Sequence, residues 1–160
     1  MRKLFSFLAV LMALLVTGLA QAHELAYDPL TGLSYISVPV YNNSGGDLDA
    51  GDVVVWDISS STGDNDAYVT TTTTADTAIV AGVIWPKTIG TGLEGSMVIW
   101  GLAECDVSSV GVVAGGPVCT ASSSAGNGDQ CTTVALESNK YAIANTTGSS
   151  SQISCFVNTQ

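Results

Sequence analysis

The side chains that could take part in chemistry are few, and most are carboxylates in turn-like segments. His23 is the only histidine, so no Ser–His–Asp or Cys–His arrangement exists unless that residue takes part. Two carboxylates could in principle hydrolyse a sugar bond. The aspartates, however, lie in segments rich in Gly, Ser and Asn, a context typical of turns. The sequence therefore favours a protein that is not an enzyme.

Two acidic segments are the candidate metal sites. The sequence DLDAGD at 47–52 and the sequence DND at 64–66 gather oxygen donors of the kind that calcium prefers. Neither segment matches the twelve-residue, helix-flanked calcium loop, and ordinary turn chemistry accounts for both. No cofactor is predicted, and calcium is the one ion that the pattern leaves open. The aspartates concerned are Asp47, Asp49, Asp52, Asp64 and Asp66.

Four cysteines, Cys105, Cys119, Cys131 and Cys155, lie in the C-terminal third of the chain. An even number in an exported chain predicts two disulfides, which allow three pairings. A zinc site is the competing interpretation, but the chain has no Cys-x-x-Cys and no second histidine. The expected pairing is Cys105–Cys119 with Cys131–Cys155, because each bond would close a local pair of strands.

The N-terminal segment has the pattern of a secretory signal peptide. Arg2 and Lys3 precede an apolar run, and Ala20-Gln21-Ala22 provides a signal-peptidase site. We therefore expect residues 1–22 to be removed, with cleavage after Ala20 as an alternative, and a secreted protein located outside the cell or at its surface. The apolar run is too short for a confident membrane span, so no membrane is expected in the mature form.

The mature chain is strongly acidic. Residues 23–160 contain 14 acidic and two basic residues, which gives a formal charge of −12. A surface of this sign repels phosphate backbones, so no nucleic-acid partner is expected. Two triplets, Asn42-Asn43-Ser44 and Asn145-Thr146-Thr147, match the N-glycosylation pattern.

The elements that must position these residues are short strands. Gly, Ser, Thr, Val and Ala dominate the composition, and strong helix formers are scarce. Turn signals recur every 8 to 15 residues, which predicts an all-β protein: a single β-sandwich or barrel-like domain of about nine or ten short strands over residues 35–160. The expected strands are 35–41, 53–56, 67–74, 78–85, 95–101, 107–113, 117–121, 132–136, 141–144 and 153–157.

Three aliphatic runs end in a tryptophan, namely Trp56, Trp85 and Trp100. Side chains alternate between the two faces of a strand, so these runs place apolar groups on both faces. A sandwich in water needs only one covered face per sheet. Either loops of the same chain or another subunit must cover the second face, and the tryptophans are interpreted as core or interface residues.

Residues 23–34 form an N-terminal arm before the first expected strand. Its apolar content predicts docking, either onto its own domain or onto a neighbouring subunit as an added strand. The arm residues concerned are Leu25, Tyr27, Leu30, Leu33 and Tyr35. The favoured function is a secreted structural subunit that assembles with copies of itself into a filament, sheath or surface layer. The alternative is a carbohydrate-binding or adhesin module that uses the tryptophans as stacking platforms.

Several short phrases between residues 38 and 157 resemble the small β-barrel or β-tulip-like decoration proteins of phage heads. They are YNNSG at 41–45, AGDVVVW at 50–56, IVAGVI at 79–84, GSMVIWG at 95–101, GPV at 116–118 and SSAG at 123–126. The resemblance implies a non-catalytic protein that packs in many copies. The predicted export signal departs from that family, whose members assemble inside the cell.

Overall fold

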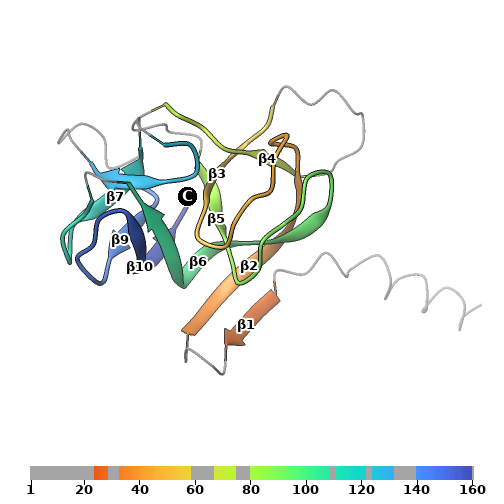
Figure 1. Ribbon diagram of the computed structural model, residues 1–160. Helices are drawn as coiled ribbons and strands as arrows, with labels where there is room; N and C mark the ends of the chain where they lie inside the picture. The colour runs from red at the N-terminus through yellow and green to blue at the C-terminus, as the bar shows by residue number, and fades with distance from the viewer. Residues whose placement is uncertain are drawn as a thin grey trace, which may run out of the picture.

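The computed structural model describes residues 24–28, 33–58, 67–74, 80–108, 111–121, 124–131 and 140–159. All the elements in these residues are strands, as the composition predicts, and none of the described residues forms a helix that could cross a membrane (Figure 1). The strands are β1 Glu24–Asp28, β2 Leu33–Asn42, β3 Val53–Trp56, β4 Tyr68–Thr70, β5 Val80–Ile84, β6 Glu94–Val107, β7 Pro117–Thr120, β8 Gly128–Gln130, β9 Ala142–Ala144 and β10 Ser151–Asn158.

The sheet closes on itself twice, and β6 belongs to both closed rings. The order β2-β4-β3-β5-β6 is closed by pairing of β2 with β6, which forms an N-terminal barrel. The order β6-β10-β9-β7-β8 is closed by pairing of β6 with β8, which forms a C-terminal barrel. The two lobes lie side by side in Figure 1, the C-terminal one on the left. The 14-residue length of β6 makes this possible, because its first half pairs with β2 and β5 and its second half with β10.

Each barrel has its own apolar core. Val54, Val69 and Met97 belong to the cluster inside the N-terminal barrel, while Val118 and Tyr141 belong to the cluster of the C-terminal barrel. The strands between the two clusters are buried on both faces, because alternate side chains enter different cores.

The valines of β3 show this division most clearly. Val54 lies in the N-terminal core, whereas the preceding Val53 packs in the C-terminal cluster with Val83 and Val98. The second apolar face of these strands is therefore covered by the other barrel of the same chain. The two-sided apolar pattern does not require a second subunit at this place.

Gly101 marks the point where β6 passes from one barrel to the other. Its backbone pairs with Tyr35 of β2 on one side and with Val157 of β10 on the other. Its φ of 109° lies in the left-handed region, and a Cβ added there would lie 2.5 Å from the Ser34 carbonyl oxygen. Only glycine permits this close approach of the strands.

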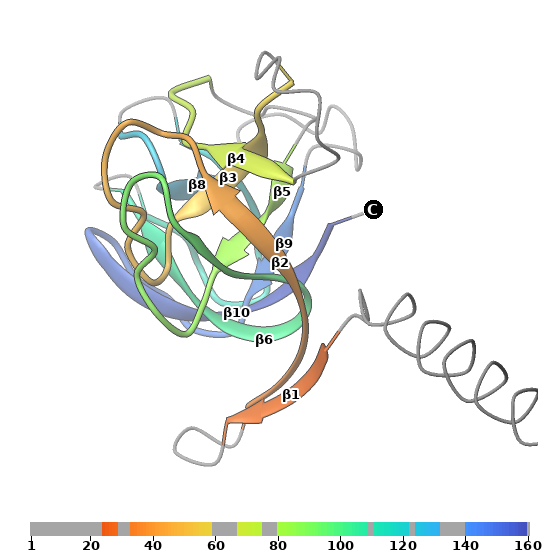
Figure 2. The same cartoon turned by 90° about the vertical axis from the view of Figure 1, so that its right-hand side faces the viewer.

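The N-terminal strand extends from the barrels as part of a hairpin. β1 pairs antiparallel with the first half of β2, from Glu24 opposite Ser37 to Asp28 opposite Leu33. Figure 2 shows this hairpin projecting beyond the barrels, while the rest of β2 runs into the N-terminal barrel. The expectation that the first strand begins at Tyr35 is wrong, because β2 begins at Leu33 and a further strand precedes it.

Both disulfides form, but the expected pairing is wrong. The β6–β10 disulfide joins Cys105 to Cys155, and the β7 disulfide joins Cys119 to Cys131, which directly follows β8. Sequence proximity favoured bonds within local strand pairs. The C-terminal barrel instead places β10 beside β6 although about 50 residues separate the two cysteines.

Some other strand boundaries differ from the expected ones, because one expected strand is longer and another forms hardly any pairs. The expected strand at 95–101 continues to Val107, while only Val112 of the 111–113 segment makes an isolated bridge. β8 was not expected, because GDQ contains no apolar residue. The expected strand at 132–136 lies outside the described residues.

Candidate functional site

The acidic turn before β3 packs against the end of β6 and the start of β10. The Asp49 backbone N–H donates to Oδ2 of Asp52 at 2.8 Å, a side-chain-to-backbone hydrogen bond within the turn. The Asp106 backbone N–H donates to the Gly51 carbonyl at 2.9 Å, and the Gln152 amide donates to the Ala50 carbonyl. These hydrogen bonds hold Asp52 close to Asp106, although the two residues are far apart in the sequence.

This packing places two carboxylates in a partly desolvated, mutually repulsive environment. Burial raises the pKa of Asp52 to about 6, the hydrogen bond from Asp49 opposes the rise, and the charges of Asp106 and Asp49 add to it. Burial also raises the pKa of Asp106, against the hydrogen bond from Gln152. Protonation of Asp52 therefore removes part of the repulsion between these carboxylates.

The sequence-predicted calcium ligands are only partly brought together. Asp49 and Asp52 share the turn, whereas Asp47 accepts a hydrogen bond from the Thr91 backbone N–H, and Asp64 and Asp66 lie outside the described residues. Within the described segments, no group of three or more His, Cys, Asp or Glu side chains is arranged to hold a metal ion. Calcium binding stays a prediction.

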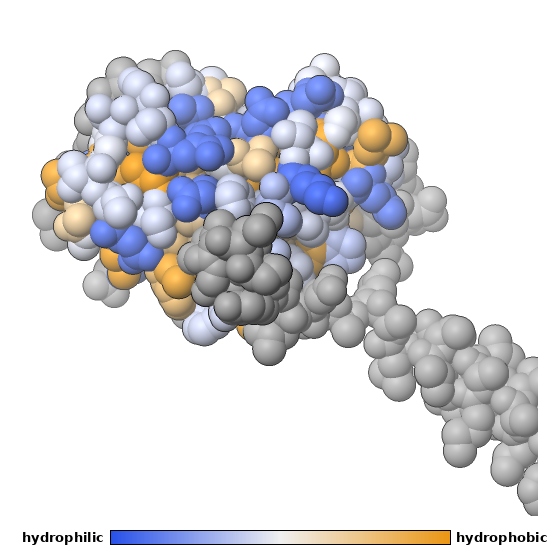
Figure 3. Space-filling model, turned by 60° about the horizontal axis from the view of Figure 1, so that its bottom comes forward, coloured by the Kyte–Doolittle hydropathy of each residue, from blue (hydrophilic) through white to orange (hydrophobic). Residues whose placement is uncertain are grey.

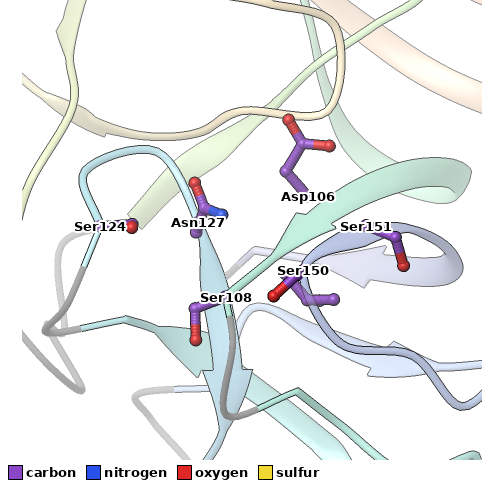
Figure 4. Close-up of a pocket in the computed structure, with 7 residues that line it drawn as sticks. Asp106, Ser108, Ser124, Asn127, Ser150 and Ser151 are labelled. Atoms are coloured by element: carbon purple, nitrogen blue, oxygen red, sulfur yellow. The ribbon is translucent and has the colours of Figure 1, made fainter.

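A polar cavity of about 510 Å³ lies beside this turn, between β6, the loop before β8 and the start of β10. Figure 4 shows Ser150 and Ser151 coming from the segment that begins β10, and Ser124 and Asn127 from the loop before β8. The residues that line it are Asp106, Val107, Ser108, Ser124, Asn127, Ser150 and Ser151. Hydroxyl, amide and carboxylate groups of this kind can bind a polar ligand by hydrogen bonds.

A buried hydrogen bond between a serine and a carboxylate lies at this cavity. The Ser108 hydroxyl donates to Oδ1 of Asp129, and both residues are buried. A buried carboxylate is stabilised by such a bond. The only histidine of the chain, His23, lies outside the described residues. Sequence analysis missed the cavity because its serines come from three distant segments and carry no motif.

The predicted arm is a strand of the chain's own sheet. Leu25 pairs in register with Ile36, and Tyr27 with Ser34, so the arm forms a hairpin with β2. Tyr35 is buried at the junction between hairpin and barrel. Leu33 begins β2, and Leu30 lies outside the described residues. No strand of the described residues pairs with the outer edge of β1, which ends the sheet order.

The three tryptophans occupy different environments. Trp85 packs against the C-terminal core cluster, and its indole N–H is buried without a hydrogen-bond partner. Trp56 ends β3 and is 37% exposed, while Trp100 in β6 is 44% exposed. The prediction that the three tryptophans are core or interface residues places only Trp85 against a core within this chain, and for Trp56 and Trp100 it stays a prediction. Trp56 pairs with β4 and Trp100 with β2 and β10, so the two rings belong to different parts of the sheet.

Trp100 belongs to a band of outward-facing apolar side chains, here called the outer apolar band, that crosses four neighbouring strands. Its ring stands edge-on to Phe156 at a centroid distance of 5.1 Å. Phe156 pairs with Leu102 on one side and Ile143 on the other, and Ile143 pairs with Pro117. The band consists of Trp100, Leu102, Phe156, Ile143 and Pro117.

The charged residue Glu104 lies beside this band. Glu104 follows Leu102 on the outward side of β6, and burial raises the pKa of its carboxyl. Figure 3 views the molecule from the side on which the hairpin projects, and hydrophobic patches interrupt the hydrophilic surface there. The signal that could have located the band is the alternation in β10, where Phe156 lies between the buried Cys155 and Val157.

The two N-glycosylation triplets differ in access. Asn42 is fully buried, and its amide donates to the carbonyls of Gly46 and Ile89, both at 2.8 Å. Its oxygen accepts from the backbone and hydroxyl of Ser44. This side chain organises the turn after β2. Asn145, in the other triplet, is exposed.

Comparison with solved structures shows a likeness in fold. No protein-family model matches the chain, and no curated protein matches it in sequence. A solved structure that is similar is the N base of head fibre gp8.5 of bacteriophage phi29, with a TM-score of 0.53 and 11% identity over 76% of this chain and 94% of that chain. At this identity the match shows a shared fold. The resemblance to structural proteins of phage heads is thus confirmed at the level of fold.

Proposed function

We propose that this protein is a secreted, non-catalytic structural subunit that assembles with copies of itself into an extracellular filament, sheath or surface layer. The observation that carries the proposal is the projecting β1–β2 hairpin, whose outer edge is unpaired within the described part of the chain. An unpaired strand edge exposes a row of backbone donors and acceptors that another strand can pair with.

The free edge of β1 stands out because the two barrels leave few other strand edges unpaired within the described residues. Barrels remove sheet edges, and the pairings of β2 and β8 with β6 close both rings. The hairpin is therefore a departure from an otherwise closed arrangement. Its strand ELAYD contains no proline and no lysine, two of the residues that natural proteins use to protect edges. The charged residues Glu24 and Asp28 lie only at its ends.

Two further observations support a structural role. The phi29 protein with a similar fold is described as the N base of a head fibre, which is a structural part of a virus particle. The polar cavity offers hydrogen-bonding groups, and its serine–carboxylate contact is buried. Location outside the cell is supported by the signal pattern in residues 1–22 and by two disulfides, which form in oxidising compartments.

The test is deletion of residues 23–34 from the mature chain. The deletion removes β1 but retains the register pairs of β2 with β6 from Tyr35 to Tyr41, so the barrels should still form. We expect negative-stain microscopy to show ordered polymers for the mature chain and single particles for the deletion variant. Near-ultraviolet circular dichroism checks that both are folded. A deletion variant that polymerises normally would contradict the arm's role.

A carbohydrate-binding module is the second candidate, and the exposure of two indole rings favours it. Trp56 and Trp100 are the exposed aromatic surfaces that sugar rings stack on. Their separate positions in the sheet would give two independent platforms. A glycan array with Trp56→Ala and Trp100→Ala as controls tests this function. Binding that each substitution weakens, by a protein that stays monomeric, would favour it over assembly.

A further inference from the structure

The same modification pattern occurs twice in the chain, and the fold gives its two copies opposite surroundings. Asn42-Asn43-Ser44 and Asn145-Thr146-Thr147 both have the Asn-x-Ser/Thr spacing of an N-glycosylation acceptor. The modification attaches a bulky sugar chain, so it needs an asparagine whose side-chain amide lies at the surface. The tertiary structure therefore decides which of the two triplets fits an attached sugar.

The triplet at 145–147 lies in the turn between β9 and β10. Asn145, Thr146 and Thr147 are all exposed. The Asn145 side-chain amide donates at the surface to the Ser154 hydroxyl at 3.4 Å, which is longer than the usual range for an N–H···O hydrogen bond. Only this weak contact has to break before the amide nitrogen can react.

The turn keeps its conformation without the Asn145 side chain. The Asn145 backbone N–H donates to the Ser154 carbonyl at 2.8 Å. The Thr147 hydroxyl accepts from the Ala114 backbone N–H at 3.0 Å, and as an acceptor it retains its own proton to donate. Residues 145–151, with the sequence NTTGSSS, are mostly exposed and contain no charged or bulky side chain. An attached sugar therefore meets little obstruction here.

The Asn42 triplet fails both of these criteria. Asn42 is fully buried, and its amide donates to the carbonyls of Gly46 and Ile89, both at 2.8 Å. A sugar on this nitrogen would replace one of its two protons, so one of the two carbonyls would lose its hydrogen bond. The added ring would also have to enter the packed turn after β2.

We propose that Asn145 carries an N-linked oligosaccharide and that Asn42 does not. The proposal rests on the proposed export of the chain, because this modification belongs to secreted proteins. The sugar donor is an isoprenoid-diphosphate-linked oligosaccharide, used by a membrane-bound transferase. Nδ2 of Asn145 forms a bond to C1 of the first sugar and loses one proton to a base of the transferase. The bond between C1 and the diphosphate oxygen breaks, and the isoprenoid diphosphate leaves with the electron pair.

A tryptic digest separates the two triplets, because Lys87 and Lys140 are the only cleavage positions after residue 22. After reduction of the disulfides, the N-terminal peptide that ends at Lys87 contains Asn42, and the peptide 141–160 contains Asn145. In protein purified from its native source, mass spectrometry should show the added mass of sugar residues on 141–160. Sugar located on Asn42 by peptide fragmentation overturns the proposal.

Two matched threonine variants test the assignment to Asn145. Thr147→Val removes the hydroxyl that the pattern requires, while Thr146→Val makes the same change at the middle position, where any residue except proline is accepted. We expect the added mass to be lost in Thr147→Val and in Asn145→Gln, and kept in Thr146→Val. Near-ultraviolet circular dichroism checks that each variant is folded. Added mass that persists in Asn145→Gln lies on another side chain of the peptide and overturns the proposal.

The same material separates this proposal from the proposed function. An unmodified peptide 141–160, from protein that is recovered outside the cell and forms polymers in negative-stain microscopy, overturns glycosylation while the structural role stands. Protein that stays inside the cell, unmodified and monomeric, overturns both.

Discussion

Replacement of Gly101 by alanine should destabilise the junction of the two barrels. The added Cβ would lie 2.5 Å from the Ser34 carbonyl oxygen and 2.6 Å from the Tyr35 Cα. These are backbone atoms of a paired strand, and Val157 is paired on the opposite side, so neither neighbour can move away freely. The φ of 109° adds a conformational cost for any residue with a Cβ.

The magnitude follows from two contributions. A left-handed conformation costs a non-glycine residue about 1–3 kcal/mol, and overpacking costs about 1–3 kcal/mol. We therefore expect Gly101→Ala to lower the free energy of unfolding by about 3 kcal/mol or more. That is a large share of the roughly 5–15 kcal/mol that stabilises a typical domain.

Two other glycines separate these contributions. Gly45 has a φ of 78° and no atom within 4 Å of an added Cβ, so Gly45→Ala measures the conformational cost alone. Gly46 also has open space around it, without a left-handed φ, and Gly46→Ala should change little. The assay is urea unfolding followed by tryptophan fluorescence. If Gly101→Ala and Gly45→Ala agree within about 0.5 kcal/mol, the steric argument at the junction is wrong.

Three further predictions concern stability. Because the pKa of Asp52 is about 6 in the fold against 3.8 in an unfolded chain, the native state binds more protons between these values, so stability should fall as pH rises from about 4 to about 6. Solvent screening limits the change to about 1 kcal/mol, and Asp52→Asn should flatten that part of a profile of melting temperature against pH. Loss of the β6–β10 disulfide, which closes a 50-residue loop, should lower the free energy of unfolding by about 4 kcal/mol. Loss of the β7 disulfide, whose cysteines are 12 residues apart, should lower it by about 3 kcal/mol. The reverse order in urea unfolding of the two double Cys→Ala variants would contradict the argument from loop length. Asn42→Asp should lower the free energy of unfolding by about 3 kcal/mol at pH 7, because it replaces two buried N–H donors by a carboxylate that faces the Gly46 and Ile89 carbonyls. An unchanged urea denaturation midpoint would show that these two hydrogen bonds contribute little.

The sequence predicted the class of fold because that class depends on local patterns. Short β-branched runs separated by Gly, Asn and Asp can only form short strands and turns, and β3, β5, β7, β9 and β10 lie where the sequence places them within a few residues. It also predicted that all four cysteines are oxidised. It missed β8, since a three-residue strand of Gly, Asp and Gln is held only by its partners β7 and β6.

The candidate sites depend on contacts between distant segments, which local patterns do not encode. Asp52 was recognised as a turn residue, but its pKa is raised mainly by burial, with a smaller contribution from the charge of Asp106, more than fifty positions away. The polar cavity gathers serines from three separate segments. Similarly, the pairing of Cys105 with Cys155 follows from the adjacency of β6 and β10, and no spacing rule favours it over the local alternatives.

By itself, the sequence determined that several strands must be buried on both faces, because runs such as Val53-Val54-Val55 leave no polar side. Only the tertiary structure decided what covers them. Because β6 is long enough to belong to two barrels, Val53 and Val54 enter different cores of the same chain, whereas Trp100 on the same strand β6 stays partly exposed. Side-chain alternation is a local property of the chain, whereas the surface that each face meets is set by which strands pair.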